Sequence, residues 1–123
     1  MNTITINSND LSKAIQNIIG VVERKQTMPI LSHILIECKK GLLTFTSTDL
    51  EVQLSTVVKT NNESGGFVTT APGRKLYEII RSLDNKELAV SISESDIKLE
   101  SSSSKFKLQS LPPNEFPLFE ATA

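Results

Sequence analysis

The sequence has one cysteine, Cys38, so no disulfide bond can form within the chain, and this usage is typical of a reducing compartment. No apolar run approaches the roughly 18 residues that a membrane-spanning helix needs. The first ten residues lack a basic segment followed by an apolar one, which argues against a secretory signal. We therefore expect a cytoplasmic protein that has no membrane partner.

The sequence also lacks the short motifs that most often indicate catalysis. It has no G-x-S-x-G, no P-loop, no dinucleotide-binding glycine pattern and no cluster of cysteine and histidine. His33, the single histidine, is interpreted as a surface or packing residue, and Cys38 as a small buried side chain. Asp49 and Glu51 would be a carboxylate pair for magnesium, but a hairpin turn explains Asp49 without a metal. We expect no catalytic residue, no metal and no cofactor.

Charge is nearly balanced over the whole chain, with a net value of −1, which by itself argues against a nucleic-acid-binding protein. The charge is unevenly distributed along the chain. The predicted helical regions 8–25 and 72–86 carry +1 and +2, so the remaining residues must carry −4. Such a split fits a protein that turns its helices toward something anionic. The alternative is that these lysines and arginines are only solvated.

One pattern of elements runs twice along the chain, across residues 3–60 and 67–110. Each copy has a strand-like segment, an amphipathic helix and three further strands. From Leu11 to Val22, apolar residues recur at helical spacing, with Lys13 on the opposite face. We expect one α+β domain over residues 1–123, made of two βαβββ repeats with two helices packed on one side of antiparallel sheets.

The second helix is predicted to open at Ala71-Pro72-Gly73, because proline suits a first helical turn. Arg74, Glu78 and Arg81 follow on one of its faces. The predicted strands are Thr3–Ile6, Ile30–Lys39, Leu42–Ser47, Glu51–Thr60, Phe67–Thr70, Glu87–Ser93, Asp96–Ser101 and Lys105–Ser110.

The last predicted strand alternates Phe106 and Leu108 with lysines, which ordinarily places one face of a strand in the core. If this strand lies at a sheet edge, its backbone could also extend a partner's sheet. After it, the three prolines of residues 111–117 exclude a helix or a central strand and indicate an ordered exit or a linker.

Four segments in order, Thr27–Leu31, Thr48–Glu51, Ala71–Leu76 and Leu111–Pro117, resemble the first domain of the bacterial DNA polymerase III beta subunits, the sliding clamps. The resemblance covers essentially the entire chain. It implies that one polypeptide contains three such domains. Two of these polypeptides close head to tail as a homodimer ring around duplex DNA. A clamp loader places the ring, which tethers the replicative polymerase and is not itself catalytic.

The resemblance also implies roles for particular residues. Arg74 matches a duplex-contacting position, and Lys25, with Arg24 beside it, matches a basic loop, although the family more often has a glycine-bearing loop there. Phe106, Leu108 and Lys75 match the subunit interface. The pocket for polymerase and loader peptides lies in later domains. The expected DNA-binding residues are Arg24, Lys25, Arg74, Lys13 and Arg81.

An alternative function remains open on the residues alone. The chain would then be a non-enzymatic interaction domain that pairs through its edge strand, while its helices are merely solvated. A metal-dependent enzyme that uses Asp49 and Glu51 is a third hypothesis.

Overall fold

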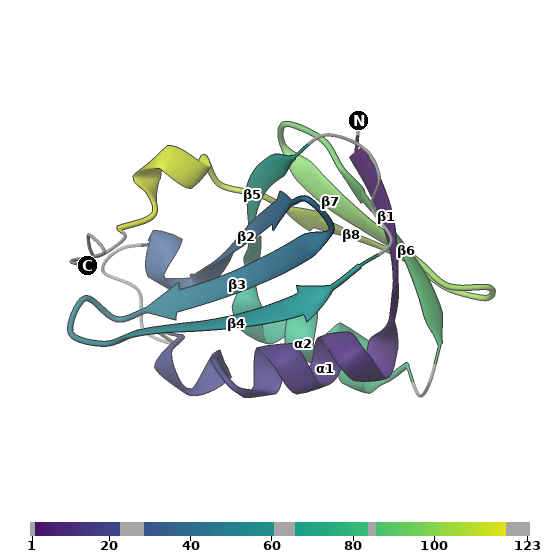
Figure 1. Cartoon of the computed structure of the whole chain (residues 1–123), viewed down its shortest axis with the longest axis horizontal. Coiled ribbons are helices and arrows are strands. Elements are labelled where there is room, and N and C mark those ends of the chain that lie inside the picture. Colours follow the sequence, from purple (N-terminus) through teal and green to yellow (C-terminus); the bar gives the residue numbers. More distant parts are fainter. Residues whose placement is uncertain (1, 23–28, 61–65, 84–85, 118–123) are drawn as a thin grey trace.

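The computed structural model describes residues 2–22, 29–60, 66–83 and 86–117 (Figure 1). Within these residues, eight strands form two antiparallel sheets. The first sheet has the order β1 (Asn2–Asn7), β6 (Glu87–Ile92), β7 (Asp96–Glu100) and β8 (Lys105–Gln109). The second has the order β4 (Gln53–Lys59), β3 (Leu42–Thr48), β2 (His33–Lys39) and β5 (Phe67–Pro72). The helices are α1 (Ser8–Gln16) and α2 (Gly73–Arg81), with 3-10 turns at Ile19–Val21, Pro29–Ser32 and Pro113–Glu115.

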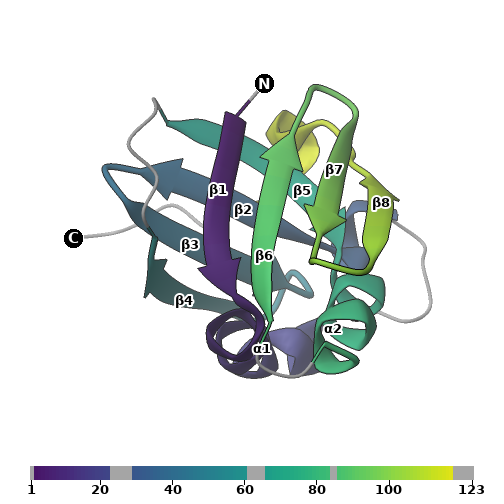
Figure 2. The ribbon, with the colours of Figure 1, turned by 90° about the vertical axis from the view of Figure 1, so that its right-hand side faces the viewer.

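The doubled βαβββ order is confirmed, but the two copies are interlocked in a way that the sequence pattern did not predict. The first strand of each copy leaves its own repeat and pairs with the other, β1 with β6 and β5 with β2. Figure 2 shows β1 beside β6 and the helices together below the sheets. Each sheet therefore needs strands from both repeats, and the repeats form one cooperative unit.

The helices are shorter than the apolar periodicity predicted. The side chain of Asn7 accepts a hydrogen bond from the backbone N–H of Asn9 at 2.8 Å and caps α1. The α-helix ends at Gln16, and the apolar stripe continues through a 3-10 turn, so that Ile18 and Val22 are still buried. Pro72 was expected in the first turn of α2 but is the last residue of β5 and precedes that turn.

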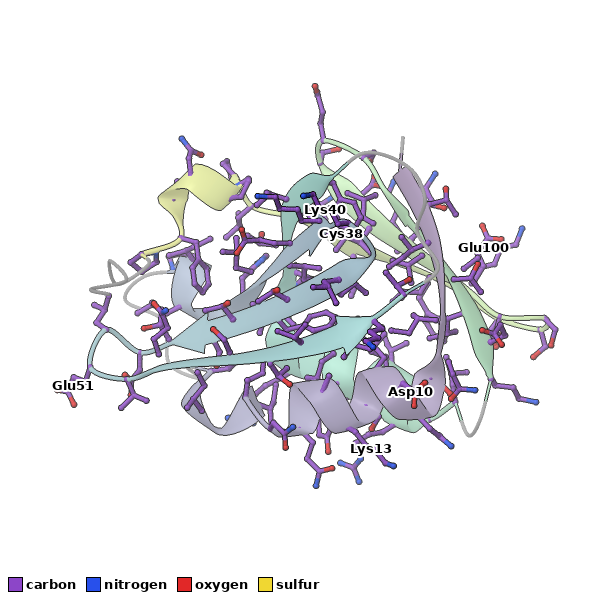
Figure 3. All side chains as sticks on the ribbon, viewed as in Figure 1. Asp10, Lys13, Cys38, Lys40, Glu51 and Glu100 are labelled. Atoms are coloured by element: carbon purple, nitrogen blue, oxygen red, sulfur yellow. The ribbon has the colours of Figure 1, made fainter. Side chains whose placement is uncertain are left out.

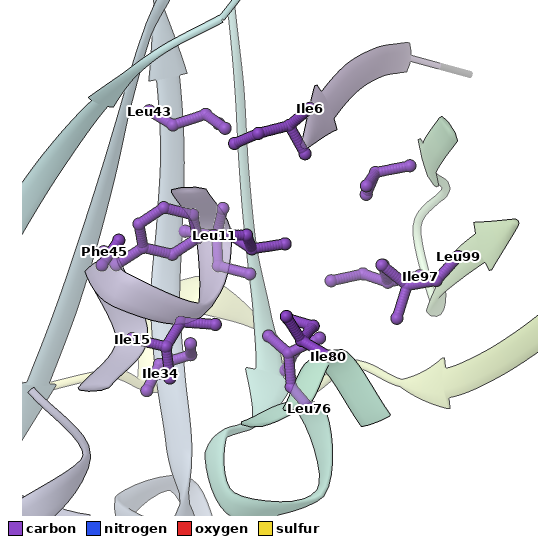
Figure 4. Close-up of a cluster of buried hydrophobic side chains, with 14 of the residues drawn as sticks. Ile6, Leu11, Ile15, Ile34, Leu43, Phe45, Leu76, Ile80, Ile97 and Leu99 are labelled. Carbon is purple, nitrogen blue, oxygen red and sulfur yellow. The ribbon is translucent and has the colours of Figure 1, made fainter. Parts of the chain in front are cut away.

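One apolar core joins both sheets to both helices (Figure 4). Alternate residues of the strands point into it, and the helices contribute residues at helical spacing. The fully buried members with the largest side chains are Phe45, Ile15, Ile18, Ile34, Leu43, Ile80, Leu88, Ile97 and Leu99. The tight turn predicted at Lys40-Gly41 is confirmed, because both residues have positive φ angles, 52° and 78°, as a type I′ hairpin requires.

The segment that follows β8 packs back onto the second sheet. Phe116 is buried against Ile30, Leu31 and Leu35, in a second cluster on the other face of β2. The hydroxyl of Thr70 donates to the carbonyl of Leu111 at 2.8 Å and accepts from its N–H at 2.8 Å. The same hydroxyl lies 3.1 Å from Nδ1 of His33. The exit segment is thus held on β5 by a buried polar group.

The buried imidazole gives stability a pH dependence. Burial lowers the pKa of His33 from its ordinary value of 6.5, because the charged form loses solvation. Below pH 6.5 the unfolded chain binds more protons than the folded chain. The free energy of unfolding should therefore decrease as the pH is lowered from 6.5, and it should level off once the pH is below the folded pKa. His33→Asn keeps an amide donor near the position of Nδ1 without titrating, and should remove this slope in urea unfolding curves measured across that range. Identical slopes in the two proteins would contradict the assignment.

Candidate nucleic-acid interface on the paired helices

The two helices of the equivalent repeats pack against each other on one side of the molecule. Each buries one face, Leu11, Ala14 and Ile15 from α1 and Leu76 and Ile80 from α2. Their other faces are open to solvent. The side-by-side helices expected from the doubled pattern are therefore present. A ligand that binds the exposed face of one helix can also contact the exposed face of the other.

The exposed faces carry a modest excess of positive charge. Lys13 is exposed on α1 and extends away from the sheets in Figure 3. Arg81 is exposed on the last turn of α2, with its guanidinium carbon 5.4 Å from the centre of the Tyr77 ring. Asp10 offsets Lys13 within α1, whereas α2 has three cations against Glu78, a net +2. The positive charge of the pair therefore comes from α2.

Arg74 differs from the other helix cations because it is half-buried. Its Nη2 donates to the carbonyl of Val22 at 3.2 Å and reaches that of Ile19 at 3.5 Å. Its Nε is buried without a hydrogen-bond partner. Sequence spacing placed Arg74 on a helix face with Arg81, but it contained no signal for this contact across more than 50 residues of chain.

The two remaining DNA-binding candidates, Arg24 and Lys25, lie outside the described residues. Their neighbour Val22 is described, and it is buried in the core and bonded to Arg74.

The predicted interface strand lies at the edge of its sheet. β8 is the last strand of its sheet and pairs with β7, with Phe106 opposite Leu99 and Leu108 opposite Ile97. Leu108 is buried and Phe106 is half-buried against the core, as the alternation indicated. Lys75 is exposed on the first turn of α2. Phe106 therefore contacts the core and also lies on the edge strand of its sheet.

The carboxylates of the β3–β4 turn have a structural role. Oδ1 of Asp49 accepts hydrogen bonds from the N–H groups of Glu51, at 2.9 Å, and Val52, at 2.8 Å. These bonds, that to Val52 first, lower the pKa of Asp49. The turn interpretation of Asp49 is therefore confirmed. No group of three His, Cys, Asp or Glu side chains is placed to hold a metal ion in the described part of the chain.

His33 and Cys38 are packing residues, as predicted. Both are buried, His33 beside Thr70 and Cys38 within the main core. Among the described helices, none has the length and apolar character needed to cross a membrane.

Comparison with known proteins agrees with this geometry. The family model of the DNA polymerase III beta subunit, N-terminal domain, matches residues 2–120. Over 117 residues the chain is 38% identical to the beta sliding clamp of Pseudomonas putida, covering 94% of this chain and 32% of that protein. It is 33% identical to a beta sliding clamp of Vibrio harveyi, covering 94% of this chain and 81% of that sequence.

A crystal structure of a sliding clamp, DNA polymerase III subunit beta, from Pseudomonas aeruginosa superposes with a TM-score of 0.92 at 35% identity, covering 99% of this chain and 33% of that one. The chain thus spans about a third of the length of several relatives that it matches. The resemblance noted in the sequence is confirmed, and the chain belongs to the family of the DNA polymerase III beta subunit, whose N-terminal domain it matches.

Proposed function

We propose that this chain is the first of three domains of a sliding clamp, a non-catalytic subunit that encircles duplex DNA in the cytoplasm and tethers the replicative polymerase. One observation carries the proposal: equivalent helices from the two repeats pack side by side and expose Lys13 and Arg81 on their outer faces. In a ring of such domains, these faces would line the central hole. The match to about a third of several clamp relatives supports the presence of two further domains.

The modest charge of the helices suits sliding. A ring that holds DNA topologically needs attraction to phosphates but no contact with base edges, because base contacts would fix its position. On the described helices, the exposed Lys13 and Arg81 and the half-buried Arg74 supply weak attraction, whereas the exposed Lys75 is assigned to the subunit interface. A dense basic patch would instead bind each position tightly and resist movement along the duplex.

Ring closure would use the open edges of the sheets. β8 ends one sheet and β4, the equivalent strand of the first repeat, ends the other. We propose that the β8 edge, with Phe106, Leu108 and Lys75, meets the other subunit in a head-to-tail homodimer. The β4 edge is then free to meet the next domain of the same chain, so that backbone pairing continues around the ring. Polymerase subunits and the clamp loader would bind mainly through the later domains.

The alternative, an interaction domain with no role for its helices, uses the same β8 edge. The similarity to sliding clamps and the paired helices favour the clamp, since the alternative gives the helix charges no purpose. The two functions differ in whether DNA is threaded.

Threading can be measured directly with the three-domain protein. Once loaded, it should remain on nicked circular duplex and be lost quickly after the circle is linearised, because a ring leaves DNA only at an end. Gel filtration of labelled protein with each DNA, at matched length and salt, measures the difference. Equal and rapid loss from both DNAs would exclude encirclement.

The helix cations should act independently of DNA sequence. Lys13→Ala and Arg81→Ala should each weaken duplex binding by the ring equally for several sequences, and each should reduce the slope of log affinity against log salt by roughly 0.9. Lys39→Ala, which removes an exposed cation from the end of β2, is the matched control and should leave the slope unchanged. An effect confined to one DNA sequence would contradict backbone binding.

The edge strand can be tested against a change in its buried neighbour. Phe106→Ala should weaken association of the subunits on the order of tenfold or more, as truncating an interface aromatic does. Leu99→Ala removes the buried residue opposite Phe106 on β7, so it loosens the same part of the core without altering the edge. Sedimentation equilibrium with melting curves separates the effects. Equal loss of association in both variants would show that core packing, not the edge, is responsible.

A further inference from the structure

The first turn of α2 contains two cations where the helix polarity disfavours them. Gly73 is the first residue of the helix, Arg74 and Lys75 follow, and no acidic residue offsets them in that turn. The N-terminal end of a helix carries partial positive charge, so a cation there is unfavourable unless another contact compensates. Lys75 extends into solvent, whereas Arg74 does not.

The compensating contact is at the end of the first helical segment. Nη2 of Arg74 donates to the carbonyl of Val22 at 3.2 Å, with the carbonyl of Ile19 at 3.5 Å. Carbonyls at a helix end carry partial negative charge, and that of Ile19 also accepts the N–H of Val22. One guanidinium therefore ties the start of α2, in the second repeat, to the end of the helical segment of the first.

Close packing beside the hydrogen bonds of Arg74 further restricts movement between the two segments. A Cβ atom added to Gly73 would lie 3.1 Å from Cγ2 of Val22 and 3.1 Å from Cγ2 of Ile34, closer than side chains normally approach. The first turn of α2 thus packs closely against the side chain of Val22. The Nε of Arg74 is buried without a hydrogen-bond partner. A side chain that extended into solvent toward a phosphate would leave Nε accessible to water and would avoid the cost of an unsatisfied donor.

We propose that Arg74 is a positioning residue for duplex binding, which acts by fixing the backbone at Ile19–Val22 against the first turn of α2, so that the helical segments of the two repeats keep their relative placement. This inference rests on the proposed clamp function. It assigns Arg74 a role different from that of Lys13 and Arg81, which are exposed. Its contribution to DNA binding then depends on the shape of the guanidinium as well as its charge.

Replacement by lysine separates shape from charge, because an ammonium keeps the charge but lacks the planar fork of donors. In the three-domain ring, Arg74→Lys should weaken binding to duplex DNA about fivefold to tenfold, nearly as much as Arg74→Ala, as expected for loss of hydrogen bonds from a charged group. Lys39→Ala is the control, because Lys39 is exposed at the end of β2, outside the helix faces, and this variant should bind like the unaltered protein. Fluorescence anisotropy over a salt series measures all of these affinities.

Amide hydrogen exchange of the 123-residue chain without DNA gives a second readout. The N–H of Val22 bonds to the carbonyl of Ile19 at 3.1 Å. Its exchange should accelerate in Arg74→Lys and Arg74→Ala but not in Lys39→Ala, while the amides of β7 remain unchanged. Faster exchange together with weaker binding of Arg74→Lys supports the inference.

Two results would overturn the positioning role. Unchanged exchange at Val22 in both Arg74 variants would show that the side chain does not hold this backbone. Full DNA affinity in Arg74→Lys would show that charge alone matters. Failure of the unaltered ring to bind duplex DNA is a separate result that counts against the proposed function, and the exchange measurement still decides whether Arg74 holds the backbone.

Discussion

The exchange of first strands between the two repeats is the constraint on which the rest of the structure depends. β1 completes the sheet of the second repeat, and β5 completes the sheet of the first. Each helix follows its exchanged strand directly, α1 after β1 and α2 after β5, so the crossing strands also bring the helices together. The helix pair and the positions of β4 and β8 at sheet edges follow from these antiparallel pairings.

Much of this arrangement was accessible from the sequence because it depends on local periodicity. Alternating and helical apolar patterns predicted every strand to within a few residues, and the Lys40-Gly41 turn followed from its residue types. The exchange of strands was not accessible in this way. Ile4 and Ile6 would bury the same face beside either repeat, so alternation alone does not choose the partner strand.

The candidate site shows the same division between local and distant contacts. Exposure of Lys13 and Arg81 follows from helical spacing, and both were predicted on outer faces. The contacts of Arg74 with Ile19 and Val22 join residues 55 and 52 positions apart and could not be read from spacing. The resemblance of the segment around Arg74 to a known family assigned the residue a contact with duplex DNA, but it gave no indication of the contact with the protein backbone.

The β4 and β8 edges, two of the four edge strands, bear on how copies of this domain can associate. β4 and β8 differ in sequence and belong to different sheets, so an edge-to-edge contact between them is heterologous, with unlike surfaces on its two sides. A contact of this kind leaves one unused edge at each end of any open assembly. If β8 of one copy pairs with β4 of another, isolated copies of the domain would form short linear chains, and the curvature at each junction would decide whether such a chain closes on itself.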